Sequence, residues 1–171
     1  EVSALLDLSD VDVRPVFLLA VNTGMRWGEL MSLAWRDVDF ERGLITIREP
    51  KNNETRYVPM NQAVRDALEA HRRQQGQEAG GIVPAVFINA DTGRPFNDLR
   101  RPLKRALRKA GVDRHIRFHD LRHTAASHMV MAGVDMRTVG AILGHKDPKV
   151  TQRYAHLAPD HLKGAVERLD Y

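Results

Sequence analysis

The sequence predicts an α+β domain that is mostly helical and contains one small three-stranded antiparallel sheet. Two observations support this class. Over most of the chain, apolar side chains recur with the 3.6-residue period of a helix, and glycines follow several of these stretches where a helix would end. Between positions 38 and 59 the pattern changes to the two-residue alternation of strands, interrupted by turn residues.

The first half of the chain is predicted to form two helices, the sheet and a third helix. The first helix stops at Gly24, because glycine readily adopts the left-handed conformation that ends a helix. Glu41-Arg42-Gly43 forms the first hairpin turn, and Asn52 and Asn53 begin the second. The predicted elements are helices over 11–23 and 26–34, strands that include Val38–Phe40, Ile45–Ile47 and Arg56–Pro59, and a helix over 61–75.

The second half is predicted to be helical after a loop over 76–84 and a short extended piece over 86–88. Asn97 is expected to cap a helix that ends at Gly111, because a side-chain amide oxygen can accept from the first free backbone N–H groups. Gly133 and Gly144 separate the helices that follow. These cover 119–132, 136–143, 150–155 and 160–169.

Composition excludes several classes of protein. The 171 residues suit one domain, and 43% are hydrophobic and 28% charged, as in globular proteins. There is no cysteine, which excludes disulfides, thiolate zinc sites and cysteine nucleophiles and fits a reducing compartment. The longest apolar run, Val16–Val21, is too short to span a membrane. Because the chain begins at Glu1 and not at Met, we expect it to be a piece of a longer protein.

Basic residues are concentrated in one segment. The chain has 26 Lys and Arg, 22 Asp and Glu, and a formal net charge of +4. Between Arg94 and Arg122, ten Lys and Arg face three Asp, whereas the rest of the chain has 16 basic and 19 acidic residues. Such a concentration is typical of a surface that binds a polyanion, although a solvated helix face would give the same pattern.

The sequence His119-Asp120-Leu121-Arg122-His123 is a candidate phosphate site. Positions three apart share a helix face, so His119 and Arg122 project together. A guanidinium offers two parallel N–H donors to phosphate oxygens, and an imidazole can move a proton. The two histidines also resemble a zinc protease helix, but that motif requires Glu where Asp120 stands.

Three further stretches add candidates for the same chemistry. Thr23-Gly24-Met25-Arg26-Trp27-Gly28-Glu29-Leu30 places Arg26 after a glycine turn at a helix start, where backbone N–H groups favour an anion. Leu143-Gly144-His145 places an imidazole at a helix end, and Tyr154 follows nine residues later. Glu29 could orient an arginine or simply face water.

Together these stretches resemble the tyrosine recombinase (phage integrase) family, in order and spacing, from about Leu5 to Leu169. The family pattern also includes a lysine in a β-hairpin, matched here by the lysine of Pro50-Lys51-Asn52-Asn53-Glu54-Thr55-Arg56-Tyr57-Val58-Pro59. A single short motif is weak evidence, but an ordered set is strong. The catalytic residues that the resemblance implies are Arg26, Lys51, His119, Arg122, His145 and Tyr154.

The resemblance implies a site-specific DNA recombinase that cuts one strand with the Tyr154 hydroxyl and leaves a 3′-phosphotyrosyl bond. Arg26, Arg122 and His145 would stabilise charge on the phosphate oxygens, so that neither a metal nor ATP is expected. Tyr154 has an ordinary pKa of about 10, and we expect surrounding positive charge to lower it. His119 is the candidate base, and Lys51 would protonate the departing 5′-oxygen.

The resemblance also implies partners and a setting. We expect double-stranded DNA, other protomers in a tetrameric synapse on DNA, a monomer without DNA, and a cytoplasmic, nucleoid-associated protein. Residues 1–171 would form a single catalytic domain that lacks the family's N-terminal DNA-binding domain. The helix over 160–169 could dock on its own core or on a neighbour.

Two alternatives to recombination stay open. A type IB topoisomerase-like enzyme would use similar tyrosine chemistry to relax DNA. A catalytically silent DNA-binding module would have no need of the tyrosine, so the complete residue set argues against it.

Overall fold

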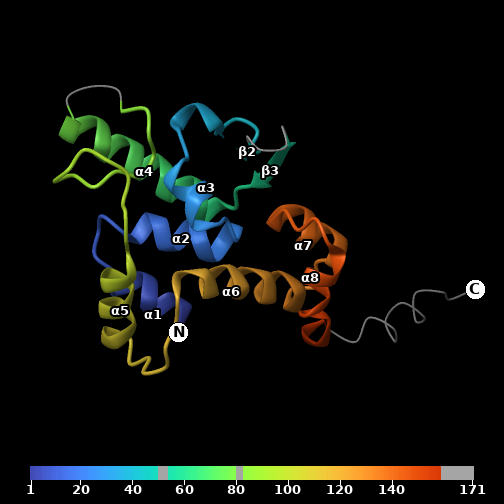
Figure 1. Ribbon diagram of the computed structural model, residues 1–171. Coiled ribbons are helices and arrows are strands. Elements are labelled where there is room, and N and C mark those ends of the chain that lie inside the picture. Colours follow the sequence, from blue (N-terminus) through green and yellow to red (C-terminus); the bar gives the residue numbers. More distant parts are fainter. Residues whose placement is uncertain (50–53, 80–82, 159–171) are drawn as a thin grey trace, which may run out of the picture.

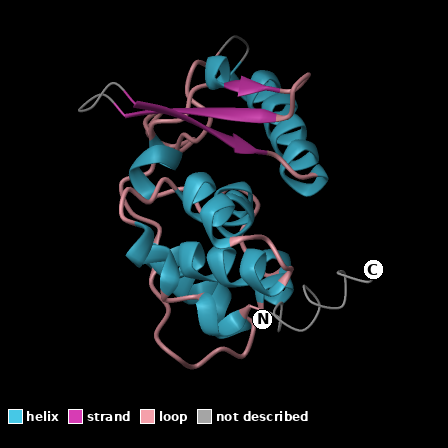
Figure 2. Ribbon diagram, turned by 90° about the vertical axis from the view of Figure 1, so that its right-hand side faces the viewer, coloured by secondary structure: helices cyan, strands magenta, loops and turns pink. Residues whose placement is uncertain are grey.

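The computed structural model describes residues 1–49, 54–79 and 83–158 and confirms the predicted α+β class. Helix α2 lies in the middle, with the sheet and α4 on one side and α1, α5 and α6 on the other (Figure 1). Figure 2 shows the sheet beside α4, with the remaining long helices gathered below. Helices α7 and α8 stand together at one end, where α7 contacts β3.

The described elements include long helices, such as α4 and α6, and short ones, such as α3 and α8. In order they are α1 (Val2–Asp7), α2 (Arg14–Thr23), α3 (Trp27–Met31), the 3₁₀ helix η1 (Trp35–Asp37), β1 (Val38–Asp39), β2 (Leu44–Glu49), β3 (Glu54–Pro59), α4 (Gln62–Ala79), α5 (Arg100–Lys109), α6 (Phe118–Met131), α7 (Met136–Leu143), α8 (Pro148–Gln152) and the 3₁₀ helix η2 (Ala155–Leu157).

Helix α2 is the centre of the main core and packs on α1, α4 and α6. It begins at Arg14 and not at position 11, because Pro15 suits the first turn of a helix, where its missing N–H costs nothing. It ends, as predicted, at Gly24, which has φ of +64°. A Cβ at Gly24 would lie 2.3 Å from Leu143 Cδ2, so this glycine also permits close approach to α7.

The sheet matches the prediction of three antiparallel strands in the order β1-β2-β3. Ile45 pairs with Val58, and both side chains are fully buried on the face toward the core. Tyr57 occupies the other face and is 60% exposed. The alternation therefore fixes which face of each strand is covered.

Helix α4 extends to Ala79, so the predicted loop over 76–84 begins too early. Gly76 lies inside the helix, where it costs only about 1 kcal/mol relative to alanine. The buried Gln75 anchors this end, because its Oε1 accepts from Trp35 Nε1 at 2.8 Å and its Nε2 donates to Val86 O at 3.2 Å. Residues 86–88 form no strand, although an isolated bridge joins Ala34 and Ala85.

Other predicted boundaries also need correction. Helix α1 was not predicted, and the helix expected over 26–34 is the shorter α3. Asn97 does not cap α5. The helix begins at Arg100, whose backbone N–H donates to Asp98 Oδ1 at 2.8 Å. The carboxylate of Asp98, one residue after Asn97, therefore accepts from the start of the helix in place of the Asn97 amide.

The C-terminal elements are short and capped by aspartates. Asp135 Oδ1 accepts from the backbone N–H of Thr138 at 2.9 Å at the start of α7, and Asp147 does the same for Lys149 at the start of α8. The helix expected over 150–155 therefore begins earlier, at Pro148, and ends at Gln152. The helix expected over 160–169 lies outside the described residues. Within the described residues, no helix is both long and apolar enough to cross a membrane.

Candidate active site

Arg26 is positioned by the short helix α3. It is the N-cap residue in extended conformation, and its backbone N–H donates to Glu29 Oε2 at 2.8 Å. Its guanidinium donates to Glu29 Oε1 at 2.8 Å and to the carbonyl of Gly144 at 2.9 Å. The side chain remains 41% exposed, so it is fixed at two points and still accessible to a ligand.

Arg122 comes from the middle of α6 and is buried, with 4% exposure. It donates from one nitrogen to Gly24 O at 2.6 Å and from the other to Leu143 O at 2.7 Å. Burial, followed by the charge of Arg26, lowers the pKa of Arg122 to about 10. It is therefore still cationic at neutral pH.

The two guanidinium groups meet at the end of α7. Arg26 binds the carbonyl of Gly144, and Arg122 binds that of the preceding Leu143. The C-terminal carbonyls of a helix are the groups that lack partners inside it, so both arginines complete that helix end. Arg26 lies 118 residues before Gly144, and Arg122 lies 21 residues before Leu143, so segments that are distant in sequence meet at this helix end.

His145 follows directly and is half-buried. Its Nδ1 lies 2.8 Å from the hydroxyl of the buried Thr151 on α8. Burial, then the charges of Arg122 and Arg26, lowers the pKa of His145 to about 4. The ring is consequently neutral at physiological pH and can still donate one N–H.

Tyr154 stands between α8 and η2 and is 6% exposed. Its ring packs in a small apolar cluster with Ala126, Val130, Val139 and Leu143. Its hydroxyl is hydrogen-bonded to Nδ1 of His123 on α6. The structure therefore holds the tyrosine ring inward, against the helix that supplies Arg122.

The expectation of a lowered tyrosine pKa is wrong for this structure. Burial raises the pKa of Tyr154 above its ordinary value, and the opposing effects of Arg153 and Arg122 are smaller. The sequence shows the cations but not the burial, which depends on how α6, α7 and α8 pack.

The structure brings His123, and not His119, to the tyrosine hydroxyl. The ring of His119 packs edge-on against His123 with ring centroids 5.0 Å apart. Burial and the charge of Arg122 lower the pKa of His119. Lys51, the remaining predicted residue, lies outside the described residues, in the connection between Glu49 of β2 and Glu54 of β3.

Sequence reasoning gave no role to Arg56, which the structure places next to the site. It forms a bidentate ion pair with Glu29, in which Nη1 donates to Oε1 at 2.8 Å and Nη2 donates to Oε2 at 2.7 Å. Its Nε donates to Ile142 O at 3.1 Å. Burial would raise the pKa of Glu29, but bonds from Arg56 and Arg26 lower it. Glu29 therefore faces two arginines and not water.

A pocket of about 240 Å³ opens beside these residues. Arg26, Arg56, His145 and Lys146 line it, together with Thr55 near the end of the β2–β3 hairpin. A concave space with several convergent cations is suited to an anion. The pocket also lies beside the strand that leads from the connection containing Lys51.

The basic segment forms a second concave surface, which we call the α5 groove. It has a volume of about 880 Å³ and runs between α5 and residues 112–119, ending at His119. Apolar side chains such as Leu103 and Leu107 form part of its wall. Its basic lining residues are Arg100, Lys104, Arg108, Arg114 and Arg117. Several of these pair with carboxylates, as Arg114 does with Glu1, so the face is less basic than the sequence suggested.

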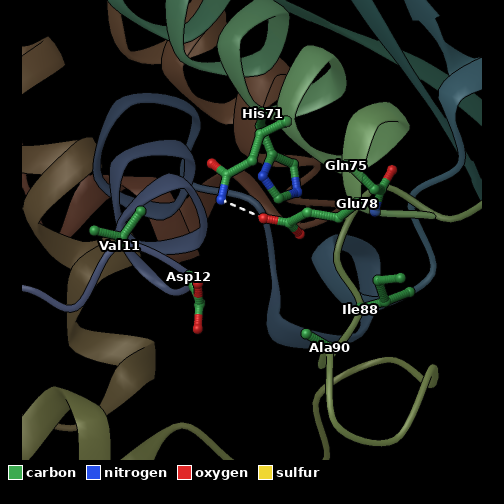
Figure 3. A pocket seen from close by; sticks show the side chains of 8 residues that line it. Val11, Asp12, His71, Gln75, Glu78, Ile88 and Ala90 are labelled. Atoms are coloured by element: carbon green, nitrogen blue, oxygen red, sulfur yellow. Dashed lines mark hydrogen bonds between the residues drawn. The ribbon is translucent and has the colours of Figure 1, made fainter. Parts of the chain in front are cut away.

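A third pocket, of about 330 Å³, contains none of the predicted residues (Figure 3). His71, Gln75 and Glu78 of α4 face Val11 and Asp12 across it. Gln74 Nε2 donates to Glu78 Oε1 at 2.8 Å along the same helix. This pocket therefore has carboxylates where the other two have cations.

The chain is similar to known proteins over most of its length. Residues 1–161 match the phage integrase family. Tyrosine recombinase XerA of Pyrococcus furiosus is 34% identical over 160 residues, which are 91% of this chain and 54% of that protein. The chain thus spans about half the length of the curated relatives it matches.

Solved structures show the same fold. A crystal structure of XerA recombinase superposes with a TM-score of 0.80 at 27% identity, covering 99% of this chain and 64% of that one. The catalytic domain of bacteriophage HP1 integrase gives 0.72 at 29% identity, covering 97% and 89%. On the family match, the sequence identity and the shared fold, the chain belongs to the phage integrase family, with tyrosine recombinases among its relatives.

Proposed function

We propose that residues 1–171 form the catalytic domain of a site-specific tyrosine recombinase, which cleaves and rejoins DNA through a covalent 3′-phosphotyrosyl bond on Tyr154. The observation that supports this most strongly is the meeting of α3, α6 and the α7–α8 segment. It gathers Arg26, Arg122 and His145 around the carbonyls of Leu143 and Gly144 and brings Tyr154 against α6. The family membership supports the same chemistry.

The two arginines bind the scissile phosphate. A guanidinium has five N–H donors, and the bonds within the described residues use two on Arg26 and two on Arg122. The remaining donors are preorganised, because each side chain is already held by two partners. Donors fixed where negative charge grows stabilise a transition state without reorganising.

The histidines complete the anion site. His145 is neutral at pH 7. The Thr151 hydroxyl donates a hydrogen bond to His145 Nδ1, so that the ring hydrogen is on Nε2 and Nε2 donates to a phosphate oxygen. Burial, followed by the charge of Arg122, lowers the pKa of His119, so its neutral ring is a further N–H donor near the phosphate.

Cleavage then proceeds by attack of the Tyr154 oxygen on phosphorus, as the phenol proton passes to a histidine of α6. The P–O5′ bond breaks, and Lys51 gives a proton to the departing 5′-oxygen. The phosphotyrosyl ester conserves the bond energy, so a 5′-hydroxyl of another strand can displace the tyrosine without ATP. We propose that the arginines stabilise the charge for which many nucleases use a metal.

DNA runs along the α5 groove toward the anion site. Lys104 and Arg108 on its wall contact phosphates, which position a duplex without reading its sequence. This binding weakens as salt rises, because each neutralised phosphate releases counterions. On DNA we expect four protomers to assemble, and without DNA a monomer, which sedimentation analysis with and without a target duplex would show.

Covalent trapping tests the proposal. The chain is mixed with nicked duplexes of varied sequence, from which the cleaved fragment diffuses away, in the presence of EDTA. We expect an SDS-stable adduct whose DNA maps by mass spectrometry to Tyr154. Tyr154→Phe should form none, whereas Tyr57→Phe, which changes an exposed tyrosine on β3, should match the parent.

The outcome that would contradict strand cleavage is equally direct. If a duplex that the chain demonstrably binds gives no adduct, or if the adduct maps to another residue, the proposed role of Tyr154 is wrong. An adduct that EDTA abolishes would instead contradict the metal-independent step.

A further inference from the structure

Helix α6 presents a second histidine to the site, one turn beyond His119. His123 Nδ1 is hydrogen-bonded to the Tyr154 hydroxyl, the atom that would attack phosphorus. The two rings have centroids 6.0 Å apart and are tilted by 45°, so they meet at their polar edges and are not stacked. The His119 ring packs nearly perpendicular to the His123 ring, with centroids 5.0 Å apart.

The surroundings of His123 keep its ring neutral. Burial lowers its pKa, and the charges of His119, Arg153 and Arg122 act in the same direction, while Asp120 opposes them. A neutral imidazole whose Nε2 carries the hydrogen has a free lone pair on Nδ1. With the hydrogen on Nε2, His123 Nδ1 accepts and the Tyr154 phenol, which is neutral at pH 7, donates.

We propose that His123 is a catalytic residue that holds the Tyr154 hydroxyl and takes its proton as the oxygen attacks the phosphate. This inference rests on the proposed function, because it assigns a step within that reaction. It differs from the sequence-based expectation, which gave the proton to His119. A general base must lie within hydrogen-bond reach of the proton it removes, and His123 meets that condition.

Cleavage and rejoining move one proton between Tyr154 and His123. The Tyr154 O–H bond breaks and an N–H bond forms on His123 Nδ1, so the ring becomes an imidazolium. The phenolate oxygen bonds to phosphorus, and the P–O5′ electron pair leaves with the 5′-oxygen, which takes the proton that the proposed function assigns to Lys51. In rejoining, a 5′-hydroxyl gives that proton back to Lys51 as it attacks phosphorus, the P–O bond to Tyr154 breaks, and the imidazolium returns its proton to the tyrosine oxygen.

The same neighbours explain why the proton is returned. Arg122, Arg153 and His119 face the imidazolium from α6 and from the residue before Tyr154, and they disfavour its charge. Asp120 on α6 opposes them and makes the charged state accessible. A base of this kind holds the proton briefly, which suits a reaction that must run in both directions.

Nitrogen NMR on the chain without DNA tests the contact itself. With ¹⁵N-labelled histidine, Nδ1 of His123 should resonate as an unprotonated acceptor at pH 7 and shift in Tyr154→Phe. If Nδ1 carries the hydrogen at pH 7, or if its signal is unchanged in Tyr154→Phe, His123 does not accept from Tyr154 and the proposal is overturned. This measurement does not depend on whether the chain cleaves DNA.

Adduct formation on nicked duplexes tests the proton transfer. His123→Asn places an amide where Nδ1 stood, so it can keep the hydrogen bond but cannot take a proton. Because general base catalysis contributes about 10²–10⁴-fold, His123→Asn should form adduct slower by about that factor. His128→Ala, which removes an exposed histidine from the same helix, should match the parent chain.

A fluorinated tyrosine at position 154 separates proton removal from a merely structural defect. Fluorine lowers the phenol pKa, so it should restore most of the rate in His123→Asn while changing the parent little. Equal rates in His123→Asn and the parent would overturn the proposal, and so would a defect that fluorination leaves unchanged. If the parent itself forms no adduct, the proposed function fails, whereas the NMR contact stands or falls on its own.

Discussion

The two ends of the molecule are built differently. The larger part, from α1 to the start of α6, has one continuous core, which includes 23 buried residues among those that the structure describes, such as Phe17 of α2 and Val64 of α4. The smaller part, formed by the end of α6 with α7, α8 and η2, encloses five buried residues of the described ranges, and one of them is Tyr154. The proposed nucleophile therefore belongs to the smaller of the two described cores.

The arginines belong to the junction between these parts. Arg26 extends from the larger part to Gly144, and Arg122 binds Gly24 on one side and Leu143 on the other. Regions with few buried apolar contacts open at lower free energy than the main core. The proposed anion site thus joins the two parts, while Tyr154 lies in the part that should open at the lower free energy.

Disrupting the contacts of Arg122 at the junction should have the largest effect on the rate of adduct formation. In Arg122→Lys the charge remains, but one ammonium cannot replace a planar guanidinium that donates to two carbonyls and that we propose also binds the phosphate. Because loss of one preorganised donor costs about 10²–10³-fold in rate, we expect adduct formation to fall at least that much. Arg105→Lys, which alters an exposed arginine paired with Asp10, should retain the parent rate. A mild effect in Arg122→Lys would show that the fork is dispensable.

Matched valines compare the two cores directly. Val64 and Val130 are both buried, and truncation to alanine removes two methyl groups worth about 2 kcal/mol in either place. Val64→Ala should speed hydrogen exchange throughout α2 and α4, whereas Val130→Ala should speed it in α7 and α8 and leave α2 protected. Equal loss of protection everywhere in both variants would mean that the two parts unfold as one unit.

The pH dependence of stability should be the smallest effect. The folded pKa of His145, about 4, lies below the unfolded value of about 6.5, so the unfolded chain binds the extra proton between these values. Stability should therefore be complete above pH 6.5 and decline as the pH falls toward 4. In His145→Gln, the thermal midpoint should fall less between pH 7 and pH 4.5. An equal fall of the thermal midpoint in the parent and in His145→Gln would show that a group other than His145 causes the pH dependence.

Much of the fold and of the site is predictable from local patterns. The switch of period at position 38 identifies the sheet, and Gly24 and Gly144 mark helix ends because both have positive φ. The spacing of Arg26, His119, Arg122, His145 and Tyr154 indicates phosphate chemistry before any contact is known. Boundaries such as the end of α4 escape prediction, because the bond between Trp35 and Gln75 comes from 40 residues away.

The sequence by itself thus determines the class of fold, the family and the residue types of an anion site, since periodicity, glycine positions and motif order are local properties. Only the tertiary structure decides that Glu29 joins two arginines, that Tyr154 is buried, and that its hydroxyl meets His123 and not His119. These features depend on where α3, α6 and α7 meet. Burial and long-range contacts set the pKa of each group, and neither is encoded in the neighbours along the chain.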